Sequence, residues 1–419
     1  VHSRVRILFL CQYFPPESNA PAARTHEHAR HWVEAGHAVT VVCGLPNHPT
    51  GEVPTEYRGR LLYRERLDGI EVLRCWLYAA PNQGVFRRSL CFITFMISAI
   101  ITGSFFAGKC DVVVATSPQM LCGIAGYVVS LFKRRPFVLE VRDLWPQQII
   151  DLGAVRNRAV IALLSGLERF MYRRARAVVT VAPATRDHIA ARGIPAEKIH
   201  VITNGIDEAF FAPRDHMTPL RAEHGWNDRT IVMYVGTHGM SQGLETVLDA
   251  ADLLRDRPEI LFVFAGSGAE REALMARAQR MGLDNVVFLP MQPRDKMPEC
   301  YATADICLAP LRGLDVFRYN IPSKMFEIMA CARPIILGAR GQAQALLEET
   351  GAGIAVEPEN ARAFADAIVR LAEDPELRRR YGERGRAAAV VAYSRRAKAA
   401  EYILCLERVL HPQRSATDT

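Results

Sequence analysis

The sequence predicts an α/β protein of two doubly wound domains, and three observations lead to this prediction. The chain has 419 residues, of which 49% are hydrophobic and 23% charged, as in ordinary globular proteins of two or three domains. Short segments rich in Val, Ile and Leu alternate with segments of helical periodicity, which is typical of a parallel sheet covered by helices on both faces. This alternation occurs twice, with a polar stretch between the two series.

Each series of predicted strands indicates one domain. The first series comprises Val5–Cys11, Val39–Cys43, Ile70–Cys75, Asp111–Thr116, Phe137–Val141 and Ala177–Val181, with helical patterns such as Ala22–Ala35 and Asn157–Arg176 between them. The second series comprises Ile231–Val235, Leu261–Ala265, Val286–Phe288, Ile306–Ala309, Pro334–Leu337 and Ile354–Val356.

The two series meet near Thr203-Asn-Gly-Ile-Asp207. We therefore place an N-terminal domain at residues 1–205 and a C-terminal domain at residues 206–392, with a helix at about 393–412 that crosses back onto the first domain. Ligands of such sheets bind at the carboxyl ends of the strands, so we expect the site in a cleft that the two domains face.

Composition and charge narrow the class of protein. The formal net charge is +7, yet the chain has no Lys/Arg tract of the kind that forms a nucleic-acid arm, so an anionic ligand or an anionic membrane surface is the expected partner. The ten cysteines are scattered singly without a CxxC pair, which indicates reduced cytosolic thiols rather than a zinc site or disulfides. The N-terminus runs directly into a strand without a signal peptide, which predicts a cytoplasmic protein.

The segment Ser89–Gly108 is long and apolar. It carries no charge over twenty residues and follows Arg87-Arg88, so its length and composition meet the threshold for a transmembrane helix. However, it lies between two predicted strands that would belong to one sheet. We therefore expect a helix of the core, either fully buried or with one face in the membrane interface where the arginines meet anionic headgroups.

A second segment, Asn320–Ala330, places a lysine and a glutamate together on a short amphipathic helix. Lys324 and Glu327 are i, i+3 neighbours, and one interpretation is an ordinary surface ion pair. The other is a ligand site in which the Ser323 hydroxyl, the free N–H groups of the first turn and Lys324 hold an anion such as a pyrophosphate, while the carboxylate of Glu327 binds hydroxyl groups such as a ribose diol. Asn320 and Pro322, just before this turn, are further candidates for contact with the same ligand.

Loops at the ends of other predicted strands add candidate ligand contacts. Glycine-rich loops that let a ligand approach the backbone contain Gly236, Thr237 and Gly239 after one strand and Gly266, Ser267 and Gly268 after the next. In the first domain, Arg142, Asp143 and Trp145 offer a cation, a carboxylate and a flat apolar ring, and the loop Phe14–Ala20 contains Ser18 and Asn19.

Several motifs of other enzyme classes are absent from the sequence. The loop after the first strand has no glycine, so the dinucleotide fingerprint of a dehydrogenase is missing, and there is no Walker motif or HExxH. The absence of any Asp-x-Asp argues against a metal-bound nucleotide-sugar site. We expect no metal and no cofactor.

The order of the segments GHAVTVV, VRDLWPQ, ITNGID, YVGTHGMSQGLETVLDAA, FAGSG and IPSKMFEIMACARPII resembles the family-4 retaining glycosyltransferases of GT-B fold. The subgroup with similar RDLWP and PSKxFE motifs is the WbuB-like bacterial transferases of O-antigen and exopolysaccharide assembly. The resemblance covers essentially the whole chain. It implies a nucleotide-diphospho-sugar donor held by the second domain, an acceptor held by the first, retained anomeric configuration and no metal.

The resemblance also assigns residues, with two departures. Glu327 matches the second glutamate of the family's Glu-x7-Glu motif, which binds the donor ribose, but Tyr319 stands where the first glutamate would be. The family's arginine and lysine for the pyrophosphate are also missing, because the chain has Thr237-His238 and Gln242 there. A metal-free pyrophosphate still needs a cation, and Lys324 is the expected substitute.

The resulting expectation is a bacterial transferase on the inner face of the cytoplasmic membrane. It would move a sugar, an N-acetylamino sugar in our interpretation, from a UDP-sugar to a polyprenyl-diphosphate-linked saccharide. Lys324, Glu327, Asp143 and Arg142 are the candidate catalytic residues, although no base role is assigned to Asp143. Ser18, Asn19 and Trp145 would contact the acceptor. Two alternatives stay open: a nonhydrolysing UDP-sugar epimerase of the same architecture, and a non-enzymatic sugar-binding protein.

Overall fold

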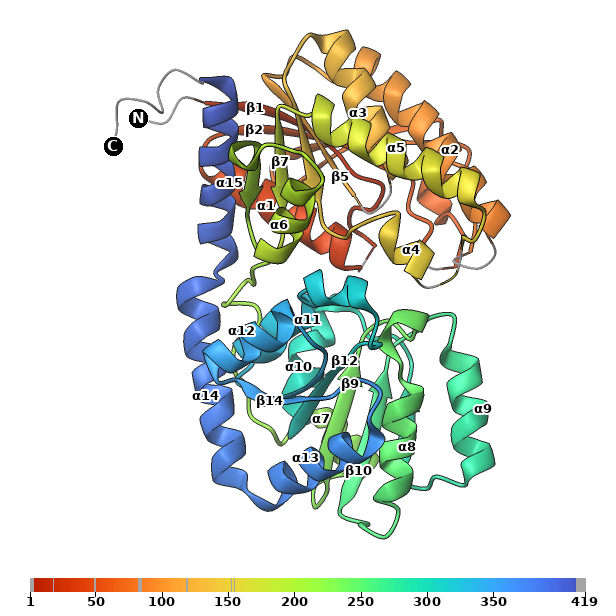
Figure 1. The fold of residues 1–419 in the computed structure, drawn as a ribbon, viewed down its shortest axis with the longest axis vertical. Coiled ribbons are helices and arrows are strands. Elements are labelled where there is room, and N and C mark those ends of the chain that lie inside the picture. The colour runs from red at the N-terminus through yellow and green to blue at the C-terminus, as the bar shows by residue number, and fades with distance from the viewer. Residues whose placement is uncertain are drawn as a thin grey trace. The chain divides into compact units, whose positions relative to one another are not determined.

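The computed structural model describes residues 4–17, 19–48, 50–81, 85–117, 120–151, 153 and 155–411. Contacts divide the chain into unit 1, which comprises Val1–Thr203 and Arg395–Thr419, and unit 2, which comprises Asn204–Ser394 (Figure 1). Each unit is an α/β structure with one mainly parallel sheet, as the alternation of apolar strands and helices predicts.

The described residues of unit 1 form an eight-stranded sheet of order β3-β4-β2-β1-β5-β6-β7-β8. Its strands are β1 (Arg6–Leu10), β2 (Ala38–Gly44), β3 (Leu62–Leu67), β4 (Ile70–Cys75), β5 (Val112–Thr116), β6 (Phe137–Val141), β7 (Ala177–Thr180) and β8 (Ile199–Val201). Its helices are α1 (Ala20–Glu34), α2 (Val85–Ile101), α3 (Met120–Lys133), α4 (Gln147–Asp151), α5 (Arg158–Arg174), α6 (Pro183–Ala191) and α15 (Arg395–Leu410).

The described residues of unit 2 form a six-stranded parallel sheet of order β11-β10-β9-β12-β13-β14. Its strands are β9 (Thr230–Val235), β10 (Ile260–Ala265), β11 (Val286–Leu289), β12 (Ile306–Pro310), β13 (Ile335–Gly338) and β14 (Gly353–Val356). Its helices are α7 (Pro219–His224), α8 (Glu245–Leu253), α9 (Arg271–Met281), α10 (Met297–Thr303), α11 (Lys324–Ala330), α12 (Gln342–Thr350), α13 (Ala361–Glu373) and α14 (Pro375–Ala392).

Every strand expected from the sequence is present, but β3 and β8 were missed. β3 pairs antiparallel with β4 through a turn at Asp68-Gly69, where both residues have positive φ (48° and 79°). An Asp-Gly pair between two strands is a strong signal for a two-residue hairpin. The alternating sequence of β3, Leu62 to Leu67, could therefore have been assigned as an edge strand from the sequence.

The last helix among the described residues, α15, belongs to unit 1 and packs against α1. The indole Nε1 of Trp32 donates a hydrogen bond to the carbonyl oxygen of Ala399 (2.9 Å), and Tyr402 lies edge-on to the Trp32 ring. All three residues are buried in the same hydrophobic core as β1 and β2, so α15 is an integral part of unit 1.

The apolar segment that resembles a membrane span forms α2 and a π-helical turn, η2 (Thr102–Phe106). Phe86–Phe106 is long and apolar enough to cross a bilayer by length and composition. The chain enters α2 from β4 and leaves η2 into β5, and both strands belong to the one sheet of unit 1. The helix is therefore a crossover of this sheet, and Phe95 on its inner side is completely buried.

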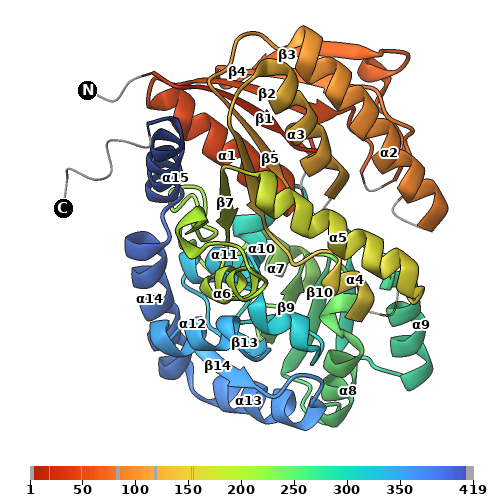
Figure 2. The same ribbon diagram turned by 45° about the horizontal axis from the view of Figure 1, so that its top comes forward.

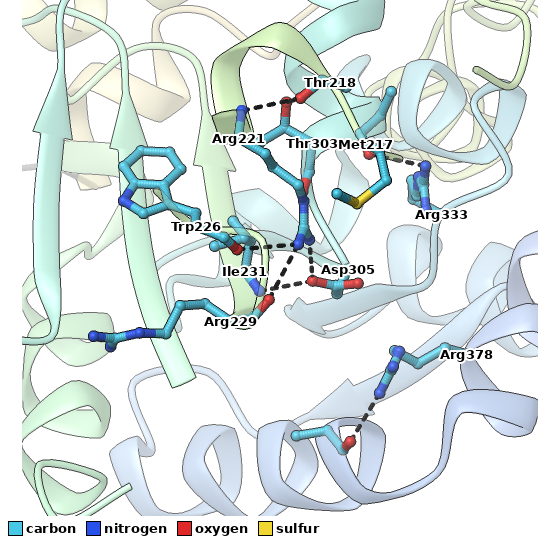
Figure 3. Close-up of polar contacts among 12 residues, drawn as sticks. Met217, Thr218, Arg221, Trp226, Arg229, Ile231, Thr303, Asp305, Arg333 and Arg378 are labelled. Atoms are coloured by element: carbon cyan, nitrogen blue, oxygen red, sulfur yellow. Dashed lines mark hydrogen bonds and ion pairs between the residues drawn. The ribbon is translucent and has the colours of Figure 1, made fainter. Parts of the chain in front are cut away.

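In unit 2, one buried arginine holds the amino-terminal ends of β9 and β12 together (Figure 3). Arg221 is 1% exposed, and its guanidinium donates hydrogen bonds to the carbonyl oxygens of Thr303 (2.9 Å), Trp226 (3.3 Å) and Arg229 (3.2 Å) and to the carboxylate of Asp305. The same carboxylate accepts the backbone N–H of Ile231 at 2.8 Å. Removing the guanidinium would leave the carboxylate and the carbonyls without this partner.

We expect Arg221→Met to lower the free energy of unfolding of unit 2 by about 3–5 kcal/mol, the usual effect of breaking a buried ion pair. Urea-induced unfolding measures this change. Arg255→Met is the control, because Arg255 and Asp252 form an exposed i, i+3 pair that contributes less than about 1 kcal/mol. Equal effects of the two substitutions would contradict the role of Arg221.

Candidate functional site

The strand order of unit 2 defines where a ligand is expected. Counted from β9, the order is 3-2-1-4-5-6, the arrangement of a dinucleotide-binding sheet, and it reverses between β9 and β12. The candidate donor residues follow the carboxyl ends of three strands: Gly236, Thr237 and Gly239 after β9, Gly266, Ser267 and Gly268 after β10, and Asn320, Pro322, Ser323, Lys324 and Glu327 after β12. They therefore lie at one edge of the sheet.

Two of these loops are in direct backbone contact. The N–H of Gly236 donates to the carbonyl of Ala265 (2.9 Å), and the N–H of His238 donates to the carbonyl of Ser267 (2.8 Å). A Cβ on Gly266 would lie 1.9 Å from the carbonyl oxygen of Gly236, so this position cannot accept a side chain. The glycines thus bring two loops together at the switch point of the sheet.

Lys324 reaches this pair of loops from the first residue of α11. Its Nζ lies 3.7 Å from the centroid of the Tyr234 ring and 3.1 Å from the place that a Cβ on Gly236 would occupy. Burial lowers the pKa of Lys324 to about 7, and the nearby Glu327 opposes this shift. The side chain is therefore a half-buried amine, and an incoming anion would stabilise its charged form, so that the amine takes up a proton from solution as the anion binds.

Glu327 is held by other partners than Lys324. Its Oε2 accepts a hydrogen bond from the hydroxyl of Tyr301 (2.7 Å), and its Oε1 lies 3.9 Å from Nη1 of Arg294. The carboxyl side chain is 19% exposed. Lys324 thus lies over an aromatic ring and Glu327 is oriented by a buried tyrosine, contacts that an ordinary surface ion pair does not require.

Two further donor candidates are Ser323, which directly precedes Lys324 in the sequence, and Thr237, in the loop that Lys324 reaches. Ser323 is the N-cap of α11, but its hydroxyl makes no capping hydrogen bond. The helix has only seven residues, so its dipole is short. The positive charge at this place comes mainly from the Lys324 side chain. Thr237 is exposed and accepts a hydrogen bond from the hydroxyl of Tyr234 (2.7 Å) through its carbonyl, which keeps the ring beneath Lys324 in place.

Sequence analysis did not single out His238 or Tyr234 as parts of this site. His238 is fully buried, contacts the rings of Tyr234, Phe264 and Phe288, and has no hydrogen-bond partner for either ring nitrogen among the described residues. Burial lowers its pKa to about 4, with smaller contributions from Arg271 and Lys324. The imidazole beneath the loop is therefore neutral near pH 7 and adds no positive charge to this site.

In unit 1, the candidate residues Arg142, Asp143 and Trp145 follow β6. Asp143 and Trp145 line a small apolar cavity together with Ser117, Met120 and residues of α5. Burial lowers the pKa of Arg142 to about 10, while the neighbouring Glu140 acts in the opposite direction. The Nε and Nη1 atoms of Arg142 are buried without a hydrogen-bond partner among the described residues, so the guanidinium has donors available for an anion.

Arg142 is next to a fully buried ion pair that fixes the end of β6. Arg24 and Glu140 are each 2% exposed and lie 3.1 Å apart, and Glu140 also accepts a hydrogen bond from the hydroxyl of Thr116 (2.9 Å). The guanidinium of Arg24 also donates to the carbonyl of Thr203 (3.1 Å) at the end of unit 1. These contacts connect α1 with β5, with β6 and with Thr203, where the first segment of unit 1 ends.

The loop after β1 holds Asn19 and a carboxylate that sequence analysis did not consider. Asn19 caps α1 by accepting the N–H of Ala22 (3.0 Å), whereas Ser18 lies outside the described residues. Glu17 is 7% exposed, and its Oε1 accepts the N–H groups of Asn47 (3.0 Å) and His48 (2.9 Å). Its Oε2 is buried without a hydrogen-bond partner among the described residues.

Burial raises the pKa of Glu17 to about 7, although the two backbone N–H groups lower it. Because its pKa in the folded protein exceeds the ordinary value of 4.5, its contribution to stability is complete below about pH 4.5 and is lost as the pH rises through 7. A buried carboxyl with such a shift is typical of functional sites.

We therefore expect Glu17→Gln to gain stability relative to the parent protein by about 2–3 kcal/mol between pH 5 and pH 8, since one pKa unit corresponds to about 1.4 kcal/mol. Urea-induced unfolding at both pH values provides the measurement. Glu56→Gln, at an exposed glutamate of the same unit, should show no such change. If the Glu17→Gln and parent curves stay parallel over this range, the carboxyl is not protonated in the folded protein.

Comparison with known proteins agrees with the two-unit structure. Residues 19–205 match the family described as "Glycosyl transferase 4-like domain", and residues 217–388 match "Glycosyl transferases group 1". The chain is 27% identical over 399 residues to the putative colanic acid biosynthesis glycosyl transferase WcaI of Escherichia coli, covering 91% of this chain and 96% of that protein. It is 29% identical to the alpha-D-kanosaminyltransferase of Streptomyces kanamyceticus, over 54% of this chain and 59% of that protein.

Solved structures show the same fold at low sequence identity. Sucrose-phosphate synthase from Thermosynechococcus elongatus superimposes with a TM-score of 0.77 at 19% identity, over 97% of this chain and 99% of that chain. Anabaena HepE, in a complex with UDP and glucose, superimposes with a TM-score of 0.73 at 19% identity, over 96% of this chain and 100% of that chain. With both domain families in their order along one chain, this protein is a family-4-like glycosyltransferase of GT-B fold.

Proposed function

We propose that this glycosyltransferase moves a sugar from a UDP-sugar to a lipid-linked saccharide at the cytoplasmic face of the membrane, without a metal ion and with retention of anomeric configuration. The donor sugar in this proposal is an N-acetylamino sugar, as the resemblance to the WbuB-like transferases suggests. Support for the donor class comes from HepE, whose structures contain UDP-glucose or UDP. Support for the pathway comes from WcaI, which is described as a colanic acid biosynthesis enzyme.

The observation that carries the proposal is the desolvated Lys324 at the switch point of the unit 2 sheet. A sugar leaves UDP as negative charge grows on the diphosphate, and a cation in a low-dielectric site stabilises that charge. Lys324 has a pKa of about 7 before a ligand binds, because burial disfavours its charge. A diphosphate would restore the charge, so donor binding is coupled to uptake of a proton.

Glu327 has the properties required of a ribose ligand. The Tyr301 hydroxyl occupies Oε2 and leaves Oε1 near Arg294 at 3.9 Å. A carboxylate in this orientation accepts hydrogen bonds from a diol, as in the second glutamate of the family motif. Tyr301 therefore acts through Glu327 rather than on the donor itself.

In unit 1, we assign the acceptor to the residues after β1 and β6. Trp145 offers an apolar ring to a sugar, Asn19 lies at the start of α1, and Arg142 provides unpartnered donors to a phosphate of the acceptor. Asp143 would orient the acceptor hydroxyl. In the transfer, the bond between the anomeric carbon and the donor phosphate breaks, the acceptor oxygen forms the new bond, and the departing phosphate takes the hydroxyl proton.

A panel of nucleotide sugars, incubated with and without a polyprenyl-diphosphate-linked saccharide, tests this function. We expect a UDP-sugar to be consumed and a glycosylated lipid to form, with the anomeric configuration established by NMR. Conversion of the donor to another UDP-sugar without acceptor would instead show an epimerase. Binding without any turnover would show a sugar-binding protein.

Lys324→Ala should reduce transfer roughly 10- to 150-fold, because a charge-assisted contact contributes about 1.5–3 kcal/mol. Part of the loss should appear in kcat, since the charge of the leaving group grows in the transition state. Steady-state kinetics with varied donor provide the measurement. The control is Lys296→Ala, at a lysine that is 57% exposed and pairs with Glu299. Normal turnover of Lys324→Ala would contradict the diphosphate role.

Tyr301→Phe should raise the KM for the UDP-sugar several-fold and change kcat little, because it removes only the hydrogen bond that orients Glu327. Glu327→Gln, which keeps the size of the side chain, should have a larger effect on the same constant. Unchanged donor KM in both variants would show that Glu327 does not bind the donor.

Transfer should persist in EDTA, since the proposed counter-charge is the Lys324 amine rather than a metal. The assay compares the initial rate before and after dialysis against EDTA, with readdition of Mg²⁺ or Mn²⁺ as the control. A loss of activity that either ion restores would contradict a metal-free mechanism.

A further inference from the structure

Three neighbouring helices of unit 1 expose an unusual number of large apolar side chains. α2 packs with η2 against α3, and α3 packs against α5, so the three helices lie side by side (Figures 1 and 2). We call the following residues the apolar surface: Phe86, Ile93, Ile97, Ile101, Phe105 and Phe106 of α2 and η2, Leu131 and Phe132 of α3, and Val160, Leu163 and Phe170 of α5, all between 40% and 80% exposed.

The apolar surface of α2 follows from its helical period. Ile93, Ile97, Ile101 and Phe105 recur every four residues and form one stripe. The opposite side of the helix carries Cys91, Phe95 and Ala99, which are buried by 96% or more. One helix therefore has two apolar faces, of which only one is required by the core of unit 1.

Contact between η2 and α3 makes the part of the apolar surface on α2, η2 and α3 continuous. The rings of Phe105 and Phe132 lie 4.9 Å apart, and Lys133 donates from Nζ to the carbonyl of Gly108 (3.3 Å). A contiguous exposed apolar surface of this kind indicates an interaction site, because isolated soluble proteins rarely expose one.

The charges on the helices that carry the apolar surface are predominantly positive. The sequence contains no acidic residue from Val85 to Cys110 or from Met120 to Pro136. The exposed cations at its margins are Arg87, Arg88, Lys109, Arg134 and Arg135, and α5 adds exposed Arg158, Arg169, Arg173 and Arg174. The acidic residue of α5, Glu168, is 2% exposed and pairs with Arg192.

We propose that the apolar surface docks on a lipid bilayer that contains anionic lipids, with α2 lying in the plane of the interface. Apolar side chains with arginines at their margins are the composition of interfacial helices, whose cations meet anionic headgroups. A spanning orientation is incompatible with the fold, because β4 and β5 on either side of α2 belong to one sheet. The inference rests on the proposed function for its purpose, delivery of a lipid-linked acceptor, but it is tested without donor or acceptor.

Flotation of the full chain with vesicles tests the docking. The probes are vesicles of phosphatidylcholine alone and of phosphatidylcholine with phosphatidylglycerol, at low and physiological salt. We expect binding to the anionic vesicles that weakens with salt. The triple variant Phe86→Ser, Ile97→Ser, Phe105→Ser should lose binding at least tenfold. The matched control is the triple variant Leu253→Ser, Val391→Ser, Leu404→Ser, at side chains that are 44–82% exposed on other helices.

A second pair of variants separates charge from apolar contact and does not alter the core. Arg87→Gln with Arg88→Gln should reduce binding to anionic vesicles several-fold and flatten its salt dependence. Arg362→Gln with Arg396→Gln, at exposed arginines elsewhere, should bind as the parent does. Melting curves confirm that each variant is folded.

Three outcomes would overturn the proposal. The first is equal vesicle binding by the parent and the apolar triple variant. The second is absence of vesicle binding by the parent, and the third is self-association in solution that the triple variant abolishes, which would make the surface an interface between two copies. Transfer to a soluble saccharide acceptor reports on the proposed function separately, and it should be unchanged in the triple variant.

Discussion

Parallel strands bring the loops that follow them to one edge of the sheet, and both candidate sites depend on this constraint. In unit 2 it places the loops after β9, β10 and β12 together, although Gly236 and Lys324 are far apart in sequence. In unit 1 it places the loop after β1 beside those after β5 and β6, because β5 lies between the other two strands. The chemistry of each site then depends on which side chains the loops present.

Burial of charged groups distinguishes these sites from the rest of the surface. Lys324 and Glu17 both have a pKa of about 7 because burial disfavours their charged forms, so each is less stable as an ion than it would be in water. In exposed ion pairs, such as Arg362 with Asp366, water stabilises both charges. These pairs therefore contribute little to the free energy of unfolding. A ligand with negative charge would stabilise the charged form of Lys324, and this favourable interaction is missing when no ligand is bound.

The sequence predicted every described strand except β3 and β8, the two sheets and the position of the glycine-rich loops at a sheet edge, because these follow from local patterns of apolar residues and from the carboxyl-edge rule. It did not predict Tyr301 as the partner of Glu327, since the two residues are 26 positions apart, on α10 and α11, and meet only in the folded unit. The burial of His238 was missed for the same reason. The hairpin at Asp68-Gly69 is different, because its signal was present in the sequence.

The composition of the apolar segment at residues 89–108 does not distinguish among three possible locations of this helix. Its length and lack of charge fit a membrane span, a buried helix and an interfacial helix equally well. The topology of the sheet removes the first, because the strands on both sides of the helix are in one sheet. The exposure of Ile97 and Phe105 opposite the buried Phe95 removes the second, since a helix wholly inside the core would cover both faces. The exposed face is therefore not covered by the described residues of unit 1, and the proposed contact with an anionic bilayer would cover it.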